Sequence, residues 1–405
     1  AAQFRMDAQV ALVYRQLGRE LPAQSYLLDL VRRYPDADYA TLGFFQTARR
    51  YYDLDRPAAP GATPSTRPRK MYEEAYATLK EFTAFHPASP LAADAQWFAV
   101  QSLVNLGQYG LAAFEAEKIP TRYEKSQWVD DALYTITLCH FQEGKYDDAL
   151  TAGVRLLTWR EVRSDGRSYE SEFVPQVELI FAKIFHARGD IAKAVDYYRM
   201  VADRFEDARD ALAFFTASEI KIDDVIAAPP GANEVPVRWR NVSKLKMKLY
   251  PVDLLLLLAK ERSLGDVSSI DLTGVAPRRE MEVALEGEKY RWNVTRVPMP
   301  VDEKGVYLVV AKADSIDVTT LLILSDVRLE LQRVGDSVRV YAIGKRDGKP
   351  IGDAFVTVSD GSRVVARGRT DARGLFEARG AGSAVTVVAE KDGSYALARE
   401  GVDAK

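Results

Sequence analysis

Cysteine and histidine are nearly absent from this 405-residue chain. It contains one cysteine, Cys139, and three histidines, His86, His140 and His186. A single thiol cannot form an intramolecular disulfide, so no disulfide framework holds the fold together. Cys139 and His140 are adjacent and would point about 100° apart on a helix, which disfavours binding of one metal ion by both. We therefore expect no metal site.

The chain also lacks an excess of charge and a long apolar run. It has 55 basic and 58 acidic side chains, whereas nucleic-acid-binding proteins show a basic excess or stripe. The five leucines at 254–258 are too few for a membrane span, which needs about 20 apolar residues, so we expect a short buried helix or core strand. No signal peptide is visible, and removal of a leader from a longer precursor stays open.

Motifs of catalysis are missing as well. The sequence has no His-Glu-x-x-His, phosphate-binding loop, dinucleotide fingerprint or Gly-x-Ser-x-Gly. Its composition, 47% hydrophobic and 28% charged, is that of ordinary globular domains. We expect a protein that is not an enzyme, with no catalytic residues, no cofactor and no small-molecule substrate.

The first half of the sequence does contain a helical repeat. Four glycines each follow a helical pattern, and each has an alanine five residues later; the pairs are Gly18 and Ala23, Gly107 and Ala112, Gly144 and Ala149, and Gly189 and Ala194. A glycine tolerates the positive φ that ends a helix, and stacked helix pairs bury faces that one pair cannot. The spacing resembles that of tetratricopeptide repeats, which have a period of about 34 residues.

The repeat pattern predicts about five helix pairs and a final capping helix. We place the pairs at residues 4–37, 38–89, 91–125, 128–163 and 173–206, and the capping helix at 208–223. The first helix of the second pair is expected at 39–53. Residues 56–69 are rich in proline and alanine and predict an exposed flexible loop, with a docking arm as the alternative.

Such an array commonly holds a peptide or a neighbouring domain on the face lined by the first helix of each pair. Five residues fall at positions that would point there: Trp97, Gln101, Tyr134, Leu138 and Lys183. We predict that they bind a protein partner. The alternative is that they pack against adjacent helices, since helical spacing alone does not separate the two.

The second half of the chain has a different periodicity. Pro229 and Pro230 cannot continue a helix, and we place the end of the helical domain at residue 226. Beyond it, Leu245, Met247 and Leu249 alternate with lysines, which indicates a half-buried strand. Thirteen strands are expected, at 235–242, 244–250, 279–285, 290–297, 306–312, 319–324, 328–332, 337–343, 354–359, 363–367, 374–378, 384–390 and 394–399.

Short strands separated by turns at this spacing predict β-sandwiches. Asp360-Gly361 and Lys391-Asp392-Gly393 supply two of the turns. We divide the second half into two sandwich domains, residues 235–325 and 326–405. The expected fold class is multidomain α + β, with an all-α tetratricopeptide-like array followed by two macroglobulin-like or immunoglobulin-like sandwiches.

Several stretches of the second half resemble bacterial α2-macroglobulin-like proteins. They are Arg240-Asn241-Val242, residues 250–254 (YPVDL), 270–274 (IDLTG), 305–310 (GVYLVV) and 324–326 (LSD), then 347–351 (DGKPI), Thr370-Asp371 and Gly374-Leu375-Phe376. Helical repeats ahead of macroglobulin domains are also an arrangement found in some bacterial members. The resemblance implies large envelope or secreted proteins, some of which trap proteases.

The chain departs from that family at the trapping chemistry. Many members capture the protease through a thioester formed at Cys-x-Glu-Gln, but Cys139 is followed by His140 and no Glu-Gln pair. A bait segment cannot be identified either. We therefore expect this chain to be an N-terminal portion of a larger protein, without the trapping chemistry itself.

These observations together predict a non-enzymatic interaction protein. In this hypothesis the repeats bind a protein partner or neighbouring domain, and the sandwiches are structural modules of a protease-binding assembly. The alternative is a scaffold of a cell-envelope or surface complex with no connection to proteases. We expect a periplasmic, secreted or other envelope location from the resemblance, while a cytoplasmic one stays open.

Overall fold

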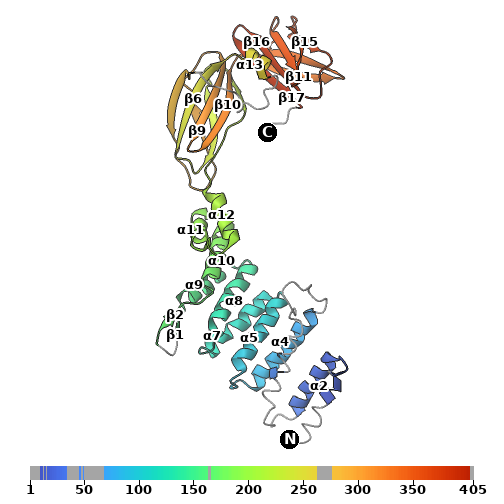
Figure 1. Cartoon of the computed structure of the whole chain (residues 1–405), viewed down its shortest axis with the longest axis vertical. Helices are drawn as coiled ribbons and strands as arrows, with labels where there is room; N and C mark the ends of the chain where they lie inside the picture. The colour runs from blue at the N-terminus through green and yellow to red at the C-terminus, as the bar shows by residue number, and fades with distance from the viewer. Residues whose placement is uncertain are drawn as a thin grey trace. The chain divides into compact units, whose positions relative to one another are not determined.

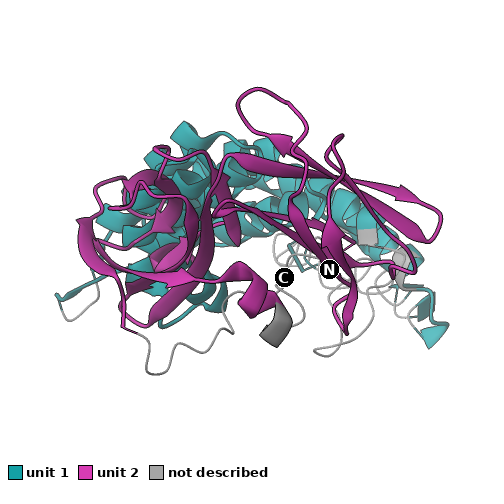
Figure 2. Ribbon diagram, turned by 90° about the horizontal axis from the view of Figure 1, so that it is seen from above, with its two compact units in different colours: residues 1–212 teal, residues 213–405 magenta. Residues whose placement is uncertain are grey.

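The whole chain is shown in Figure 1 as a computed structural model. It divides into two compact units, residues 1–212 and 213–405 (Figure 2). Unit 1 is helical and unit 2 is built of β-sheets, which confirms the expected fold class. The residues that the structure describes are 10–11, 13–14, 16–33, 45–46, 49, 68–162, 166–261 and 276–401.

Three of the sequence predictions fall mainly outside these described residues. They are the helix at 39–53, the loop at 56–69 and the resemblance at 270–274. None of the described helices is both long and apolar enough to cross a lipid bilayer.

Unit 1 consists of helices that pack in antiparallel succession, and a short hairpin interrupts them. The helices are α2 (Glu20–Arg33), α4 (Pro68–Phe85), α5 (Ala92–Asn105), α6 (Tyr109–Ala116), α7 (Lys118–Arg122), α8 (Val129–Gln142), α9 (Tyr146–Thr158), α10 (Val174–Ala187) and α11 (Ile191–Val201). Helices α5 and α6, α8 and α9, and α10 and α11 form the pairs. The hairpin joins β1 (Glu161–Val162) to β2 (Ser168–Tyr169), between α9 and α10.

The predicted turns between paired helices are confirmed. Gly107 has φ 70° and Gly144 has φ 72°, the left-handed conformation that a glycine adopts without strain. The backbone N–H of the residue after each glycine donates a hydrogen bond to a carbonyl in the last turn of the preceding helix. For example, the Gln108 N–H donates to the Leu103 carbonyl at 2.9 Å, as in a Schellman motif. The alanines that follow five residues later are fully buried at 112, 149 and 194.

The capping helix is shorter than predicted, and β-structure begins earlier. Helix α12 (Glu206–Thr216) ends seven residues before the expected position. The Asn241 side-chain amide donates to the Phe215 and Ala217 carbonyls, at 2.6 and 2.9 Å, and satisfies groups at the helix end. The following residues form β3 (Glu219–Lys221) and β4 (Val225–Ala228). The boundary predicted at residue 226 is therefore too late, because both strands belong to the sheets of unit 2.

The first sandwich of unit 2 packs a three-stranded sheet on a five-stranded sheet. The sheet orders are β3-β5-β8 and β4-β10-β9-β6-β7, formed by β5 (Glu234–Arg240), β6 (Lys244–Val252), β7 (Arg279–Ala284), β8 (Asn293–Pro298), β9 (Gly305–Ala313) and β10 (Ile316–Leu324). Val237 and Trp239 of one sheet share a core with Leu245, Met247 and Val309 of the other. The predicted alternation in 244–250 is thus confirmed.

The second sandwich packs three strands on four. The orders are β11-β12-β15 and β14-β13-β16-β17, formed by β11 (Val327–Val334), β12 (Ser337–Gly344), β13 (Phe355–Ser359), β14 (Val364–Arg369), β15 (Leu375–Ala378), β16 (Val385–Lys391) and β17 (Ser394–Glu400). Val338, Val356 and Val387 meet in its core. On the outer face of the four-stranded sheet, Val388 and Leu397 pack on the first sandwich.

The leucine run forms a short helix, α13 (Leu254–Glu261), which is one of the two predicted outcomes. Leu254 and Leu258 are fully buried against the outer face of the five-stranded sheet. Leu256 is 71% exposed. The run is therefore amphipathic in its packing, because residues four apart share one face of a helix while the residue between them points away.

Candidate partner-binding groove of the helical unit

The first helix of each described pair begins with the same local arrangement. A serine hydroxyl accepts a hydrogen bond from the backbone N–H two residues later, at 3.2 Å from Trp128 to Ser126 and at 3.1 Å from Phe173 to Ser171. Such a turn satisfies one of the donors that a helix leaves unpaired at its start. The residue after the turn is thereby held at the N-cap of α8 or α10.

These N-cap aromatic residues stack on the preceding repeat. Trp128 lies against Trp97 of α5, with ring centroids 5.2 Å apart and planes inclined by 15°. Phe173 lies against Tyr134 of α8 in the same way, at 4.8 Å and 4°. Trp97 and Tyr134 occupy the sixth position of their helices. The same contact thus joins two successive pairs of repeats.

The structure shows which contacts are made by the five residues that we predicted to bind a partner. Trp97 and Tyr134 serve in the stacks, and Leu138 packs beside the buried Ile180 and Ile184. Lys183 makes an ion pair with Asp207, with 2.6 Å between Nζ and Oδ2, and Gln101 is half-buried on α5. None of the five lines the groove described next. Their predicted role in binding stays a prediction, and their contacts agree with the alternative of packing between helices.

A groove of about 730 Å³ opens beside the start of α8. Its walls come from the α7–α8 loop, the first turn of α8, the β1–β2 hairpin with Trp159 and Arg160 before it, and the start of α10. The charged residues that line it are Glu124, Lys125, Asp130, Asp131, Arg160, Glu161, Glu170 and Glu172. Six of these are acidic and two are basic, so the groove is strongly negative.

The negative charge is concentrated around Asp131. Burial and, to a smaller extent, the neighbouring charges of Asp130 and Glu172 together raise the pKa of this carboxyl to about 6. Asp130 accepts a hydrogen bond from the Ser171 hydroxyl at 2.9 Å, and Arg160 pairs with Glu170 at 2.8 Å. A carboxyl with a raised pKa is one whose charge lacks compensation, so the groove favours a cationic group.

A second groove of about 670 Å³ lies one repeat earlier along the array. It is lined by the start of α5 and by residues 124–127, which also line the acidic groove. Its charges are balanced, because Arg122 and Lys125 accompany Asp94 and Glu124. The two grooves together make a surface along the starts of the first helices, and the acidic part is confined to one end.

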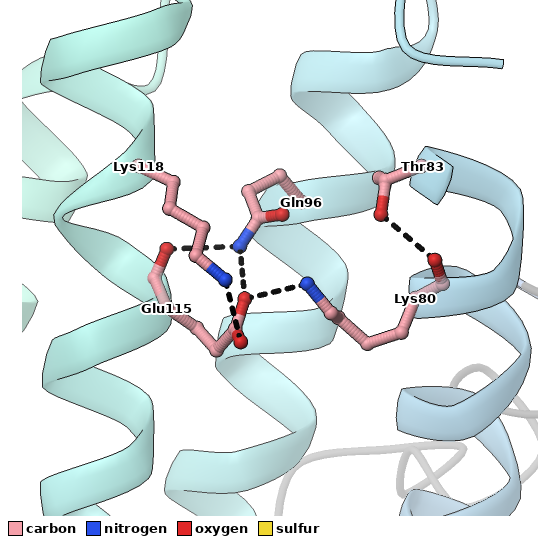
Figure 3. A network of polar contacts seen from close by, with 5 residues as sticks. All are labelled: Lys80, Thr83, Gln96, Glu115 and Lys118. Atoms are coloured by element: carbon pink, nitrogen blue, oxygen red, sulfur yellow. Dashed lines mark hydrogen bonds and ion pairs between the residues drawn. The ribbon is translucent and has the colours of Figure 1, made fainter. Parts of the chain in front are cut away.

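A buried ion cluster fixes the helices of the earlier repeat (Figure 3). The Glu115 carboxylate accepts hydrogen bonds from Lys80, Gln96 and Lys118, each at 2.8 Å. Burial acts to raise the pKa of Glu115, but the hydrogen bonds from Lys118, Lys80 and Gln96 outweigh it and hold the pKa below its ordinary value. This cluster contacts no groove-lining residue by hydrogen bond and is a structural tie between α4, α5 and α6.

The single thiol is not reactive in this structure. Cys139 is fully buried, and burial together with Glu143 raises the pKa of its thiol to about 12. Within the described part of the chain, no group of three His, Cys, Asp or Glu side chains is arranged to bind a metal ion.

Sequence reasoning missed the acidic groove because three separate segments build it. The pair Asp130 and Asp131 resembles any solvated acidic helix start when the sequence is taken alone. A usable signal was the recurrence of serine two residues before an aromatic residue, at Ser126 and Ser171. It marks equivalent helix starts, and hence which acidic residues the fold brings together.

An α2-macroglobulin matches part of this chain. The chain is 33% identical to the Alpha-2-macroglobulin of Ralstonia nicotianae over 110 residues, which are 26% of this chain and 7% of that protein. The resemblance predicted from the sequence is thereby confirmed as a similarity. The matched segment spans a small fraction of that relative, and no protein-family model matches the chain.

Two solved structures are similar to parts of this chain. Native alpha-2-macroglobulin from Escherichia coli, spanning domains MG0-NIE-MG1, covers 45% of this chain and 63% of its own, with 18% identity and a TM-score of 0.38. A tetratricopeptide repeat protein from Parabacteroides merdae covers 53% of this chain and 72% of its own, with 13% identity and a TM-score of 0.36.

Proposed function

We propose that this chain is an interaction module of an α2-macroglobulin-like protein, in which the helical unit binds a protein partner through the acidic groove. The observation that carries the proposal is the groove itself, in which the half-buried Asp131 lies among five other carboxylates and two cations. Burial and the neighbouring carboxylates disfavour the charged form of Asp131, and a lysine or arginine of a partner would stabilise that form by pairing with it. The partner is therefore a protein with a basic exposed segment.

The sandwiches have a different role in this proposal. Residues 235–325 and 326–405 act as structural modules, since each has a packed apolar core and none of their described residues belongs to a group that could hold a metal ion. The similarity to an α2-macroglobulin supports a place in a protease-binding assembly of the cell envelope or the secreted fraction. Catalysis has no part in this function.

A direct test measures binding of a basic probe to the full chain. We would titrate the protein into a fluorescein-labelled peptide of alternating lysine and alanine residues and follow anisotropy at low and moderate salt. The variant Asp131→Asn/Glu172→Gln should bind at least about tenfold more weakly, because close charge pairs contribute about 1.5 kcal/mol or more. Binding should also weaken as salt rises, since the groove is open to solvent.

The matched control is Asp203→Asn/Asp210→Asn, which changes the net charge by the same amount. Both residues are exposed in unit 1 and line neither groove. This variant should bind the peptide like the parent protein. Equal weakening by both variants would show that the peptide senses only net charge, and the acidic groove would then have no role as a site.

The protease-binding part is tested separately with the full chain and a broad-specificity protease. A complex that co-elutes in size-exclusion chromatography, formed with the catalytically inactivated protease and weakened by Asp131→Asn/Glu172→Gln, supports it. If no protease co-elutes while the basic peptide still binds, the scaffold function without proteases becomes the better description, and the groove remains its binding site.

A further inference from the structure

The outer face of the three-stranded sheet in unit 2 has an unusual composition. Val235, Val237 and Trp239 of β5 point into the core, so the residues between them face outward. We call this outward surface the cationic–aromatic face. Its basic and apolar residues are Lys221, Arg238, Arg240, Trp292, Val294 and Arg296, with Phe214 of α12 at its end, and the same side of the sheet also carries Glu219, Glu234 and Pro236.

Two aromatic rings on this face are exposed and yet held in position. Phe214 is 61% exposed and Trp292 is 42% exposed. The Arg240 guanidinium carbon lies 4.7 Å from the centre of the Phe214 ring and 5.5 Å from that of Trp292. The Lys221 ammonium lies 4.8 Å from the centre of the Trp292 ring. Rings fixed in this way need little further ordering when a partner binds.

Arg240 contacts both rings and is itself held in place. Its side chain is buried and forms an ion pair with Glu219, while Glu219 also lies 3.8 Å from Lys221. Tryptophan and arginine are the residues most enriched among the energetically dominant contacts of protein interfaces. The face therefore has the composition of a binding surface whose aromatic part is already ordered.

The exposed charges of the face are arranged unfavourably in the free protein. Lys221 lies directly opposite Arg238 in the pairing of β3 with β5, and like charges in that position destabilise a sheet. Arg238 in turn lies opposite Val294, which is 65% exposed. The ion pairs of Arg238 with Asp223, at 3.4 Å, and of Lys221 with Glu219, at 3.8 Å, are long and open to solvent, so they offset only part of the repulsion. An anionic ligand would relieve it.

We infer that the cationic–aromatic face binds an extended acidic segment of a partner protein. Carboxylates of the segment would lie on Lys221, Arg238 and Arg296, and an apolar side chain between them would cover Trp292 and Val294. An anionic lipid surface fits less well, because membrane-binding basic clusters have about four to eight lysines and arginines, and this face exposes three. The surface belongs to unit 2 and is independent of the acidic groove.

The test uses the full chain and two probes. The first is a fluorescein-labelled peptide of alternating acidic and apolar residues, and the second is vesicles of phosphatidylglycerol. The variants Lys221→Gln/Arg238→Gln and Trp292→Ala should each weaken peptide binding by about tenfold. The double variant should also melt at about the same temperature as the parent, because removal of a like-charge pair offsets the loss of the two solvent-exposed ion pairs. That melting result separates lost binding from lost folding.

A matched control exists on the five-stranded sheet. Lys246 and Lys312 are likewise directly opposite each other, and Lys246→Gln/Lys312→Gln removes the same charge. It should leave peptide binding unchanged. The inference is overturned if the parent protein does not bind the peptide, if the control weakens binding as much as Lys221→Gln/Arg238→Gln, or if only the vesicles bind and do so through these residues.

Discussion

The indole of Trp97 lies flat against the indole of Trp128, and Trp128 Nε1 also donates to the Asp94 carboxylate at 2.5 Å. One side chain at the start of α8 thus contacts two positions of α5, the first helix of the preceding repeat. The stack of Tyr134 on Phe173 repeats this relationship one unit later. The stability of the array therefore depends on contacts between neighbouring repeats, as expected for stacked helix pairs.

Removing one partner of this stack should destabilise unit 1. Trp97→Ala should lower its free energy of unfolding by about 3–5 kcal/mol, because the ring is buried and leaves a cavity. Urea denaturation followed by far-UV circular dichroism measures the change, since the helical signal comes from unit 1. Phe114→Ala is the control; its ring is exposed, and we expect a change of no more than about 0.5 kcal/mol.

The buried Glu115 should make unit 1 sensitive to acid. Its folded pKa lies below the ordinary value of 4.5, so its stabilisation is present above that pH and is lost as the pH falls through the folded pKa. Glu115→Gln should cost about 2 kcal/mol at pH 7, because it weakens hydrogen bonds to two charged donors. The loss should shrink toward pH 3. An equal loss at both pH values would contradict the proposed charge pairing.

Asp131 should show the opposite dependence on pH. Its folded pKa of about 6 lies above the ordinary 3.8, so the charged form destabilises the fold, and this cost develops as the pH rises from about 4 to 6. Asp131→Asn should therefore raise the free energy of unfolding by about 1 kcal/mol at pH 7.5, allowing for solvent screening. Denaturant melts at pH 7.5 and 3.5 test this, and we expect no gain at the lower pH.

The leucine helix offers a matched pair of substitutions. Leu258 is fully buried and Leu256 is 71% exposed, although both belong to the same short run. Leu258→Lys should lower the stability of unit 2 by several kcal/mol, because an unpaired charge is placed among apolar side chains. Leu256→Lys should change it by about 0.5 kcal/mol or less. Tryptophan fluorescence during thermal melting distinguishes the two, and equal losses would refute this orientation of α13.

The strands of unit 2 were predictable to within a few residues where the pattern is local. The alternation of Leu245, Met247 and Leu249 with lysines identifies β6 because a half-buried strand requires it. β8 begins at Asn293 rather than at residue 290, because Tyr290 has φ 64° and cannot continue a strand. β3 and β4 were missed, since β4 pairs in parallel with a strand about a hundred residues away and its four residues carry no period of their own.

The candidate site was less predictable than the fold. Helical spacing placed Trp97 and Tyr134 on one face of the array, but it could not show that an aromatic ring of the next repeat covers each of them. The groove around Asp131 depends on the hairpin between α9 and α10, an insertion outside the repeat pattern. The exposure of Leu256 could not be predicted from the sequence either. In a run of identical residues, no difference between polar and apolar positions shows which side of the helix faces the solvent.

The parallel pairing of β4 with β10 has a kinetic consequence. Residues 225–228 leave the ribosome long before their partners at 321–324 are synthesised, and at about 5–20 residues per second the interval is on the order of 5–20 s. Until then the five-stranded sheet lacks β10, the strand that lies between β4 and β9, so β4 cannot join the sheet. The first sandwich therefore has to fold after its last strand emerges, while the helical repeats ahead of it, whose contacts are local, can fold as they are made.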